Sequence, residues 1–153
     1  MYRFWQHLAI AGLINGKYTG VRGSGGVWHH VLGTNAPTAA IPKSGFSFKY
    51  LNYPNGDSES YGMNYGNQFT FGLERGNNQP YSPIFTPAEA QAFDDKIDDG
   101  KPATGLVIAV MPNYSWGNVN SCTTSANNHD YTGIYRTTHN TISCSFVIKT
   151  GEY

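Results

Sequence analysis

Charge is scarce in this sequence. Ten Lys and Arg residues balance ten Asp and Glu residues, so charged side chains make up only 13% of the 153 residues and the formal net charge is zero. That share is about half of what soluble domains usually carry. Because binding to phosphate draws on excess positive charge, we predict that neither a nucleic acid nor an anionic membrane surface is the main partner.

Long apolar runs and catalytic motifs are also missing. No run of 18 apolar residues occurs, so the sequence predicts no membrane-spanning helix among these residues, and no signal peptide is visible. The patterns G-x-S-x-G and H-E-x-x-H and the P-loop are absent. We therefore predict a non-enzymatic protein without catalytic residues. A hydrolase is a further hypothesis, and it requires a pocket in which His and Asp side chains converge.

The histidines do not form a recognisable metal motif. Adjacent His29 and His30 would point to opposite faces of a strand, so they cannot easily share a metal ion. We favour structural roles for all five histidines and predict no cofactor or metal bound by them. The five are His7, His29, His30, His129 and His139.

Cysteine is scarce too, with only Cys122 and Cys144 in the chain. They are not in C-x-x-C spacing, which argues against a zinc knuckle or a thioredoxin-type motif. Two cysteines allow one intramolecular pairing, and we predict this disulfide; two free buried thiols in a cytosolic protein are the alternative. A disulfide implies an oxidising compartment, and we then expect a targeting segment upstream of Tyr2.

Neutral hydrogen-bonding residues and aromatics take the place of charge, with 18 Gly and 11 Tyr among them. This composition suits sheet faces and long ordered loops. The length is that of one ordinary domain, which can bury a real core. We predict a single α+β domain over residues 1–153.

A helix is predicted over Tyr2–Ile14. Phe4 and Leu8 recur at helical spacing, and Asn15-Gly16 is a typical helix stop. No N-cap residue precedes the helix, which is typical of the end of a longer one. Gly12 would allow this helix to approach a sheet closely.

Five further segments are predicted to be strands. The second and third alternate polar and apolar residues and would form a hairpin across a long loop rich in Tyr and Asn. The fourth is a continuous apolar run, which predicts a central strand. In the last, Cys144, Phe146 and Ile148 share one face, so a disulfide to Cys122 would staple the preceding polar loop to it. The five are Val27–Leu32, Phe46–Tyr50, Gln68–Leu73, Leu106–Met111 and Cys144–Lys149.

A second helix is predicted at residues 87–98. Thr86, Pro87 and Glu89 occupy the N-cap, N1 and N3 positions of a capping box, and Gly100 suits the position that ends the helix.

The acidic end of this second helix requires a specific explanation. Asp94, Asp95, Asp98 and Asp99 lie near a helix C-terminus, where negative charge opposes the macrodipole. Such carboxylates would form a salt bridge, accept hydrogen bonds from loop amides, or bind a cation. We favour a structural hydrogen-bonding role, with calcium as the alternative, because an EF-hand loop places its acids at alternate positions and not in adjacent pairs.

Aromatic residues are frequent in or near the predicted loops. Such residues can stack on sugars or anchor a protein partner. We favour the interpretation that they pack the loops against the sheet. They are Tyr50, Tyr53, Tyr61, Tyr65, Tyr81, Tyr114 and Trp116.

Three stretches together carry a family resemblance. They are residues 4–14 (FWQHLAIAGLI) with Tyr18-Thr19-Gly20, residues 86–105 (TPAEAQAFDDKIDDGKPATG), and Cys122 with the terminal segment 144–147 (CSFV). Together they cover about a third of the chain, and this pattern resembles the periplasmic heads of bacterial type IV pilin-like proteins, including type II secretion pseudopilins. Residues 21–85 show no match.

The resemblance implies a leader peptide, a long apolar helix and a globular head in which the end of that helix packs on an antiparallel sheet. Residues 1–14 would be the remnant of the helix, and Phe4, Trp5, Leu8 and Leu13 would join it to the head. The cleavage site and apolar helix that define the family are absent from these residues. Some family members bind calcium in a loop after the sheet, but no matching ligand set is present here.

The resemblance therefore implies a filament subunit, which has other pilin or pseudopilin subunits as partners and reaches the membrane only through the missing part of its helix. Its head would lie in the periplasm or on the cell surface. The alternative is a secreted carbohydrate- or protein-binding module that uses the aromatic loops. A prepilin-type leader upstream of Tyr2 would favour the first hypothesis and an ordinary signal peptide the second.

Overall fold

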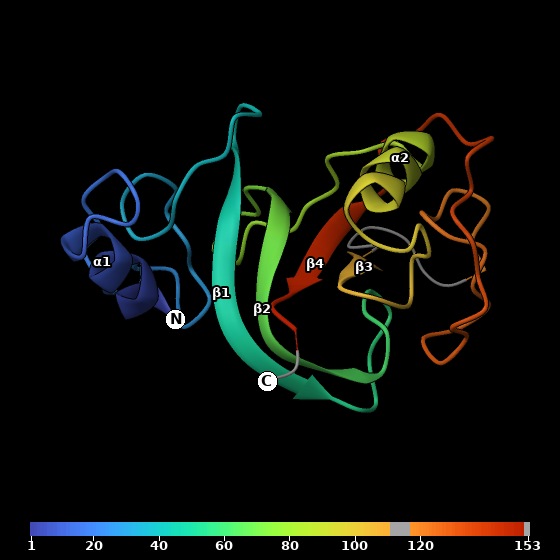
Figure 1. The fold of residues 1–153 in the computed structure, drawn as a ribbon, viewed down its shortest axis with the longest axis horizontal. Coiled ribbons are helices and arrows are strands. Elements are labelled where there is room, and N and C mark those ends of the chain that lie inside the picture. Colours follow the sequence, from blue (N-terminus) through green and yellow to red (C-terminus); the bar gives the residue numbers. More distant parts are fainter. Residues whose placement is uncertain (111–116, 152–153) are drawn as a thin grey trace.

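The computed structural model describes residues 1–110 and 117–151. Within these residues the chain forms two helices and four strands (Figure 1). The strands make one antiparallel sheet in the order β1-β2-β4-β3. The predicted α+β class, with an N-terminal helix and a short second helix, is confirmed. The elements are α1 (Tyr2–Ile10), β1 (Ser44–Tyr53), β2 (Met63–Leu73), α2 (Pro87–Ile97), β3 (Val107–Val110) and β4 (Ser145–Lys149).

Strands β1 and β2 form the predicted hairpin, and Figure 1 shows that both are long and curved. They pair from Ser44–Leu73 at one end to Tyr53–Met63 at the other, with a register shift between Leu51 and Asn52. The strands therefore extend into the segment that the sequence predicts as loop. Only residues 54–62 connect them.

The predicted central strand is the edge strand β3, which corrects the sequence interpretation. All four residues of β3 are buried, and the backbone N–H of Ala109 donates to the carbonyl of Pro102 in the preceding loop, at 2.8 Å. A continuous apolar run indicates that both faces of a strand are buried, and an edge strand covered by other segments has the same apolar sequence as a central strand. The C-terminal strand β4 is the one inserted into the sheet, between β2 and β3. Met111, the last residue of the predicted strand, lies outside the described residues.

The sheet has two unlike faces because side chains alternate along each strand. One face, here called the aromatic face, carries Phe46, Phe48, Phe69, Phe71 and Phe146. The opposite face, here called the cavity face, carries Ser47, Lys49, Gln68, Thr70 and Val147. Both helices contribute aromatic side chains to the aromatic face: Phe4 of α1 stacks on Phe48, and Phe93 of α2 stacks on Phe146.

Helix α1 ends at Ile10, earlier than the sequence predicts. Gly12 adopts a left-handed conformation with φ of 71° and donates its N–H to Ala9, while Leu13 donates to Leu8. These two bonds form a Schellman motif, in which glycine is favoured because it has no Cβ. The close approach to a sheet expected of Gly12 is wrong: apart from its two chain neighbours, none of the described residues has an atom within 4 Å of the position that a Cβ of residue 12 would take.

Helix α2 begins as the sequence predicts. The Thr86 hydroxyl accepts the N–H of Glu89, and the Glu89 carboxylate accepts the N–H of Thr86 at 2.9 Å, so the capping box is confirmed. Gly100 has a positive φ of 70°, but it lies two residues beyond the C-cap Asp98.

The predicted strand at Val27–Leu32 is wrong. Only Leu32 makes a β-bridge there, to Ala36. The N–H of Gly25 donates to Nδ1 of His29 at 2.8 Å, and the N–H of Gly23 donates to the carbonyl of His29. The hydrogen-bonding groups of this segment therefore bond within the loop itself, whereas in a strand they would bond to a neighbouring strand.

Candidate functional site

The contact between α1 and the sheet rests on two aromatic residues. The Phe4 ring stacks on Phe48 with centroids 3.8 Å apart, and buried Trp5 lies 5.8 Å from the Phe69 ring. Leu8 is partly buried. Leu13 leaves 71% of its surface exposed beyond the end of the helix, so the packing role predicted for it does not fit the structure.

The outward side of α1 is open to solvent. Arg3 and His7 are exposed, and Ile10 leaves 78% of its surface accessible. These three residues are spaced four and three apart, so they lie along one stripe of the helix. Neither described helix is long and apolar enough to cross a membrane.

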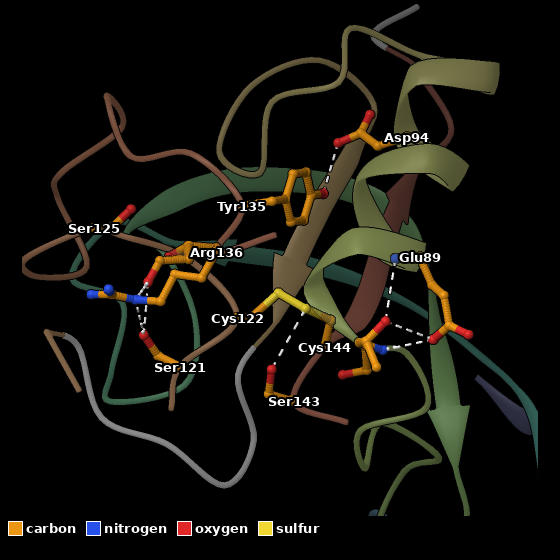
Figure 2. Close-up of a disulfide and its surroundings, with 12 residues drawn as sticks. Glu89, Asp94, Ser121, Cys122, Ser125, Tyr135, Arg136, Ser143 and Cys144 are labelled. Atoms are coloured by element: carbon orange, nitrogen blue, oxygen red, sulfur yellow. Dashed lines mark hydrogen bonds between the residues drawn. A yellow bond between two sulfur atoms is a disulfide. The ribbon is translucent and has the colours of Figure 1, made fainter. Parts of the chain in front are cut away.

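The predicted disulfide is present. Cys122 and Cys144 are fully buried, and their Cα atoms lie 5.1 Å apart (Figure 2). The carbonyl of Cys144 accepts backbone N–H groups of Ile84 and Phe85, and the carbonyl of Cys122 accepts the N–H of Arg136. The bridge therefore joins the C-terminal loop to the start of β4 and to the segment that leads into α2.

Hydrogen bonds from Arg136 and Tyr135 hold the loop on both sides of the disulfide. Nε of Arg136 donates to the carbonyl of Thr123 at 2.7 Å and to the Ser121 hydroxyl at 3.3 Å. Figure 2 shows the Tyr135 ring pointing toward α2, where its hydroxyl donates to Asp94 at 2.7 Å.

The acidic segment has the structural role that the sequence interpretation favours. Asp98 accepts the backbone N–H groups of Leu106 and Val107, while Asp99 accepts the N–H of Lys101 and the hydroxyl of Thr104. The carboxylates thus tie the end of α2 to the loop that leads into β3.

Asp94 is the buried member of this acidic segment. It accepts the N–H of Gly100 at 3.2 Å in addition to the hydroxyl of Tyr135. Burial raises the pKa of Asp94 to about 6, although both hydrogen bonds lower it. Oxygens of Asp94, Asp98 and Asp99 lie within 4.8 Å of one another, and among the described residues no other three or more His, Cys, Asp or Glu side chains come together in this way. Each of the three carboxylates already accepts hydrogen bonds from the protein, so their closeness to one another does not require a bound ion.

A cavity of about 350 Å³ opens on the cavity face of the sheet. Its floor comes from all four strands, including Leu51 of β1, Thr70 of β2, Val147 of β4 and Val110 of β3. Its walls come from the 54–62 connection and from the segment after β2, to which Asn78 belongs. Segments far apart in the sequence therefore build one hollow.

The side chain of Gln68 lines the cavity and forms no hydrogen bond among the described residues. The residue is 0% exposed, and neither Nε2 nor Oε1 of its side chain has a partner in the described part of the chain. A buried polar group without a partner costs about 1–3 kcal/mol. Nearby, the Ser47 hydroxyl bonds to Thr70 and donates to Oε1 of Gln79 at 3.0 Å.

Paired charges form part of the cavity wall. Glu59 accepts two hydrogen bonds from the Arg75 guanidinium, at 3.0 and 3.1 Å, and one from the Tyr81 hydroxyl at 3.3 Å. These hydrogen bonds hold the 54–62 connection against the segment after β2. On the other side, the Lys49 ammonium lies 5.1 Å from the Trp28 ring centroid. Burial lowers the pKa of Lys49 to about 8, although the nearby Asp57 carboxylate raises it.

Most of the aromatic residues singled out in the sequence have structural positions. Tyr61 and Tyr65 are buried, and the Tyr61 hydroxyl bonds to Ser125 at 2.7 Å, which ties the C-terminal loop to the hairpin. Tyr53 and Tyr81 are half-buried in the cavity wall, whereas Tyr50 is exposed on the other side of β1. Tyr114 and Trp116 lie outside the described residues.

The histidines do not converge on a common site. His30 is buried, with Nδ1 against the carbonyl of Trp28 at 2.8 Å and its ring 4.7 Å from that of Tyr2. Its Nε2 has no hydrogen-bond partner within residues 1–110 and 117–151. His129 bonds to loop atoms of Asn128 and Pro54.

Sequence reasoning did not single out Gln68, Lys49 or Trp28 as site residues. The alternation in β2 predicts that Gln68 lies opposite the phenylalanines, but it does not show that other segments cover that face. No protein-family model, curated protein or solved structure matches this chain.

Proposed function

We propose that this chain is the head of a filament subunit of the type IV pilin or type II secretion pseudopilin kind. The proposal rests on the sequence resemblance and on one structural observation. Helix α1 packs on the sheet through Phe4 and Trp5 while its opposite stripe, Arg3, His7 and Ile10, remains exposed. A helix with one side on its own head and the other side free suits contact with the helices of neighbouring copies.

The disulfide supports a mechanical role. It links two residues 22 positions apart and joins the C-terminal segment to the strand that is inserted into the sheet. Such a bridge resists unravelling of the loop from the sheet. Disulfides persist in oxidising compartments, so we place the head in the periplasm or on the cell surface, anchored through an upstream apolar helix before assembly. The function is structural, and the partners are other subunits.

Filament assembly tests the proposal. In source cells that express the gene with its own upstream coding sequence, we expect a prepilin-type leader and about 20 apolar residues before Tyr2. Filaments sheared from these cells should contain this chain by mass spectrometry. Ile10→Asp should remove the chain from the sheared fraction, because it places a carboxylate in the subunit contact.

Ile134→Asp is the matched control, because Ile134 is 64% exposed on the C-terminal loop, away from α1. Both variants should unfold at the temperature of the unchanged protein. Equal recovery of the two variants in filaments, or an ordinary signal peptide upstream, would contradict the proposal.

A second candidate function is a secreted binding module. The observation that favours it is the cavity with the unpaired Gln68 amide at its floor.

A further inference from the structure

We propose that the cavity on the cavity face is a binding site for a neutral, multiply hydroxylated small molecule such as one monosaccharide unit, with the Gln68 carboxamide as its central hydrogen-bonding group. The inference goes beyond filament assembly and does not depend on it.

The size and enclosure of the cavity suit a small molecule. Its volume of about 350 Å³ lies in the range of about 300–1,000 Å³ that small-molecule sites occupy. Strands build the floor, and the ion pair between Glu59 and Arg75 fixes two of the wall segments to each other. The hollow is therefore built on rigid elements.

The unpaired amide defines the polar chemistry of the ligand. Gln68 offers two N–H donors and one carbonyl acceptor, and neither polar atom has a partner among the described residues. Because Gln68 is 0% exposed, a ligand contacts its amide once the neighbouring side chains shift aside. A hydroxyl group both donates and accepts, so two neighbouring hydroxyls on one ligand complement a carboxamide. Binding would then replace the unfavourable free energy of unpaired groups with hydrogen bonds in a site of low dielectric constant.

The charges around the cavity favour a neutral ligand. Lys49 and Asp57 line the wall with opposite charges, and the Glu59 carboxylate is already occupied by Arg75 and Tyr81. The positive charges of Lys49 and Arg75 therefore balance the negative charges of Asp57 and Glu59. A charged ligand would add a charge without a compensating partner to a partly desolvated site, which would weaken its binding.

Aromatic rings supply the apolar part of the surface. Trp28, Tyr53, Tyr65 and Tyr81 line the cavity. The C–H face of a sugar ring packs on such rings while its hydroxyls reach polar groups, which matches the mixture of amide and aromatic groups here. Trp28 is 44% exposed and stands next to Lys49, so it is accessible to an entering ligand.

The test is a titration followed by the side-chain NMR signals of Gln68 and Trp28. The probes are glucose, galactose, mannose and N-acetylglucosamine, with glucuronic acid and glucosamine as charged analogues. We expect at least one neutral sugar to shift both signals with saturation, and its charged analogues to bind more weakly. Ordered water can also satisfy an amide, so failure of every sugar to shift the Gln68 signals would overturn the proposal in favour of a hydrated cavity.

Two variants and a control complete the test. Gln68→Leu removes both unpaired polar atoms, so it should weaken sugar binding about tenfold or more while the protein stays as stable as before or becomes more stable. Trp28→Ala should weaken binding similarly without unfolding the protein. Tyr50→Ala changes an exposed aromatic residue of β1 that lies on the opposite side of the sheet from the cavity, and it should leave binding unchanged. Unaltered affinity in Gln68→Leu would show that binding occurs elsewhere and would refute the assignment.

Discussion

Removal of the disulfide is the perturbation whose effect the structure defines best. The double variant Cys122→Ala, Cys144→Ala replaces two fully buried sulfurs by hydrogen and leaves the backbone bonds of both residues in place. The native fold should survive, because Ile84 and Phe85 still donate to Cys144 and Arg136 still donates to Cys122 through main-chain groups.

The expected loss follows from the length of the closed loop. A sequence separation of 22 residues gives about 3.4 kcal/mol in the chain-entropy description, because the open chain has more unfolded conformations. Loss of packing around the buried sulfurs adds to this. We therefore expect the free energy of unfolding to fall by about 3–5 kcal/mol, a large fraction of the roughly 5–15 kcal/mol that holds a domain folded.

Urea denaturation measures both the loss and its origin. If the disulfide acts on the unfolded chain, the double variant should show a steeper dependence on urea, because its unfolded state exposes more surface. Phe146→Ala is the control, since truncation of a buried Phe costs about 3–5 kcal/mol without changing the cross-link. A loss below about 1 kcal/mol, or a loss with unchanged urea dependence, would refute the entropic reasoning.

Two further predictions concern α2. Since the pKa of Asp94 in the folded protein is about 6, above its value in the unfolded chain, the stabilising contribution of its protonated form should be complete below about pH 4 and lost as the pH rises through about 6. Thermal unfolding across this range should show wild type losing stability relative to Asp94→Asn, and a constant difference between them would contradict the assignment. Thr86→Ala should lower the free energy of unfolding by about 1 kcal/mol, because it removes the hydroxyl that caps Glu89. An unchanged urea midpoint in Thr86→Ala would show that the capping bond does not contribute.

Local sequence patterns predicted those features that depend on residues close together in the chain. The capping box at Thr86 and Glu89 is complete within four residues, and the alternation in β1 and β2 follows from the two-residue repeat of a strand. The disulfide was predictable because the chain has only two cysteines. The helix end was misplaced because both Gly12 and Asn15-Gly16 can terminate a helix, and the local sequence does not decide between them.

The sequence by itself therefore determined the α+β class, the beginning of α2, the hairpin and the pairing of Cys122 with Cys144. Only the tertiary structure decided that β4 enters between β2 and β3, and that the face carrying Gln68 becomes the floor of a cavity. The physical reason is distance along the chain. Gln68 pairs with Lys149 of β4, far along the chain, and such a pairing depends on how all the segments between them pack, which no local periodicity encodes.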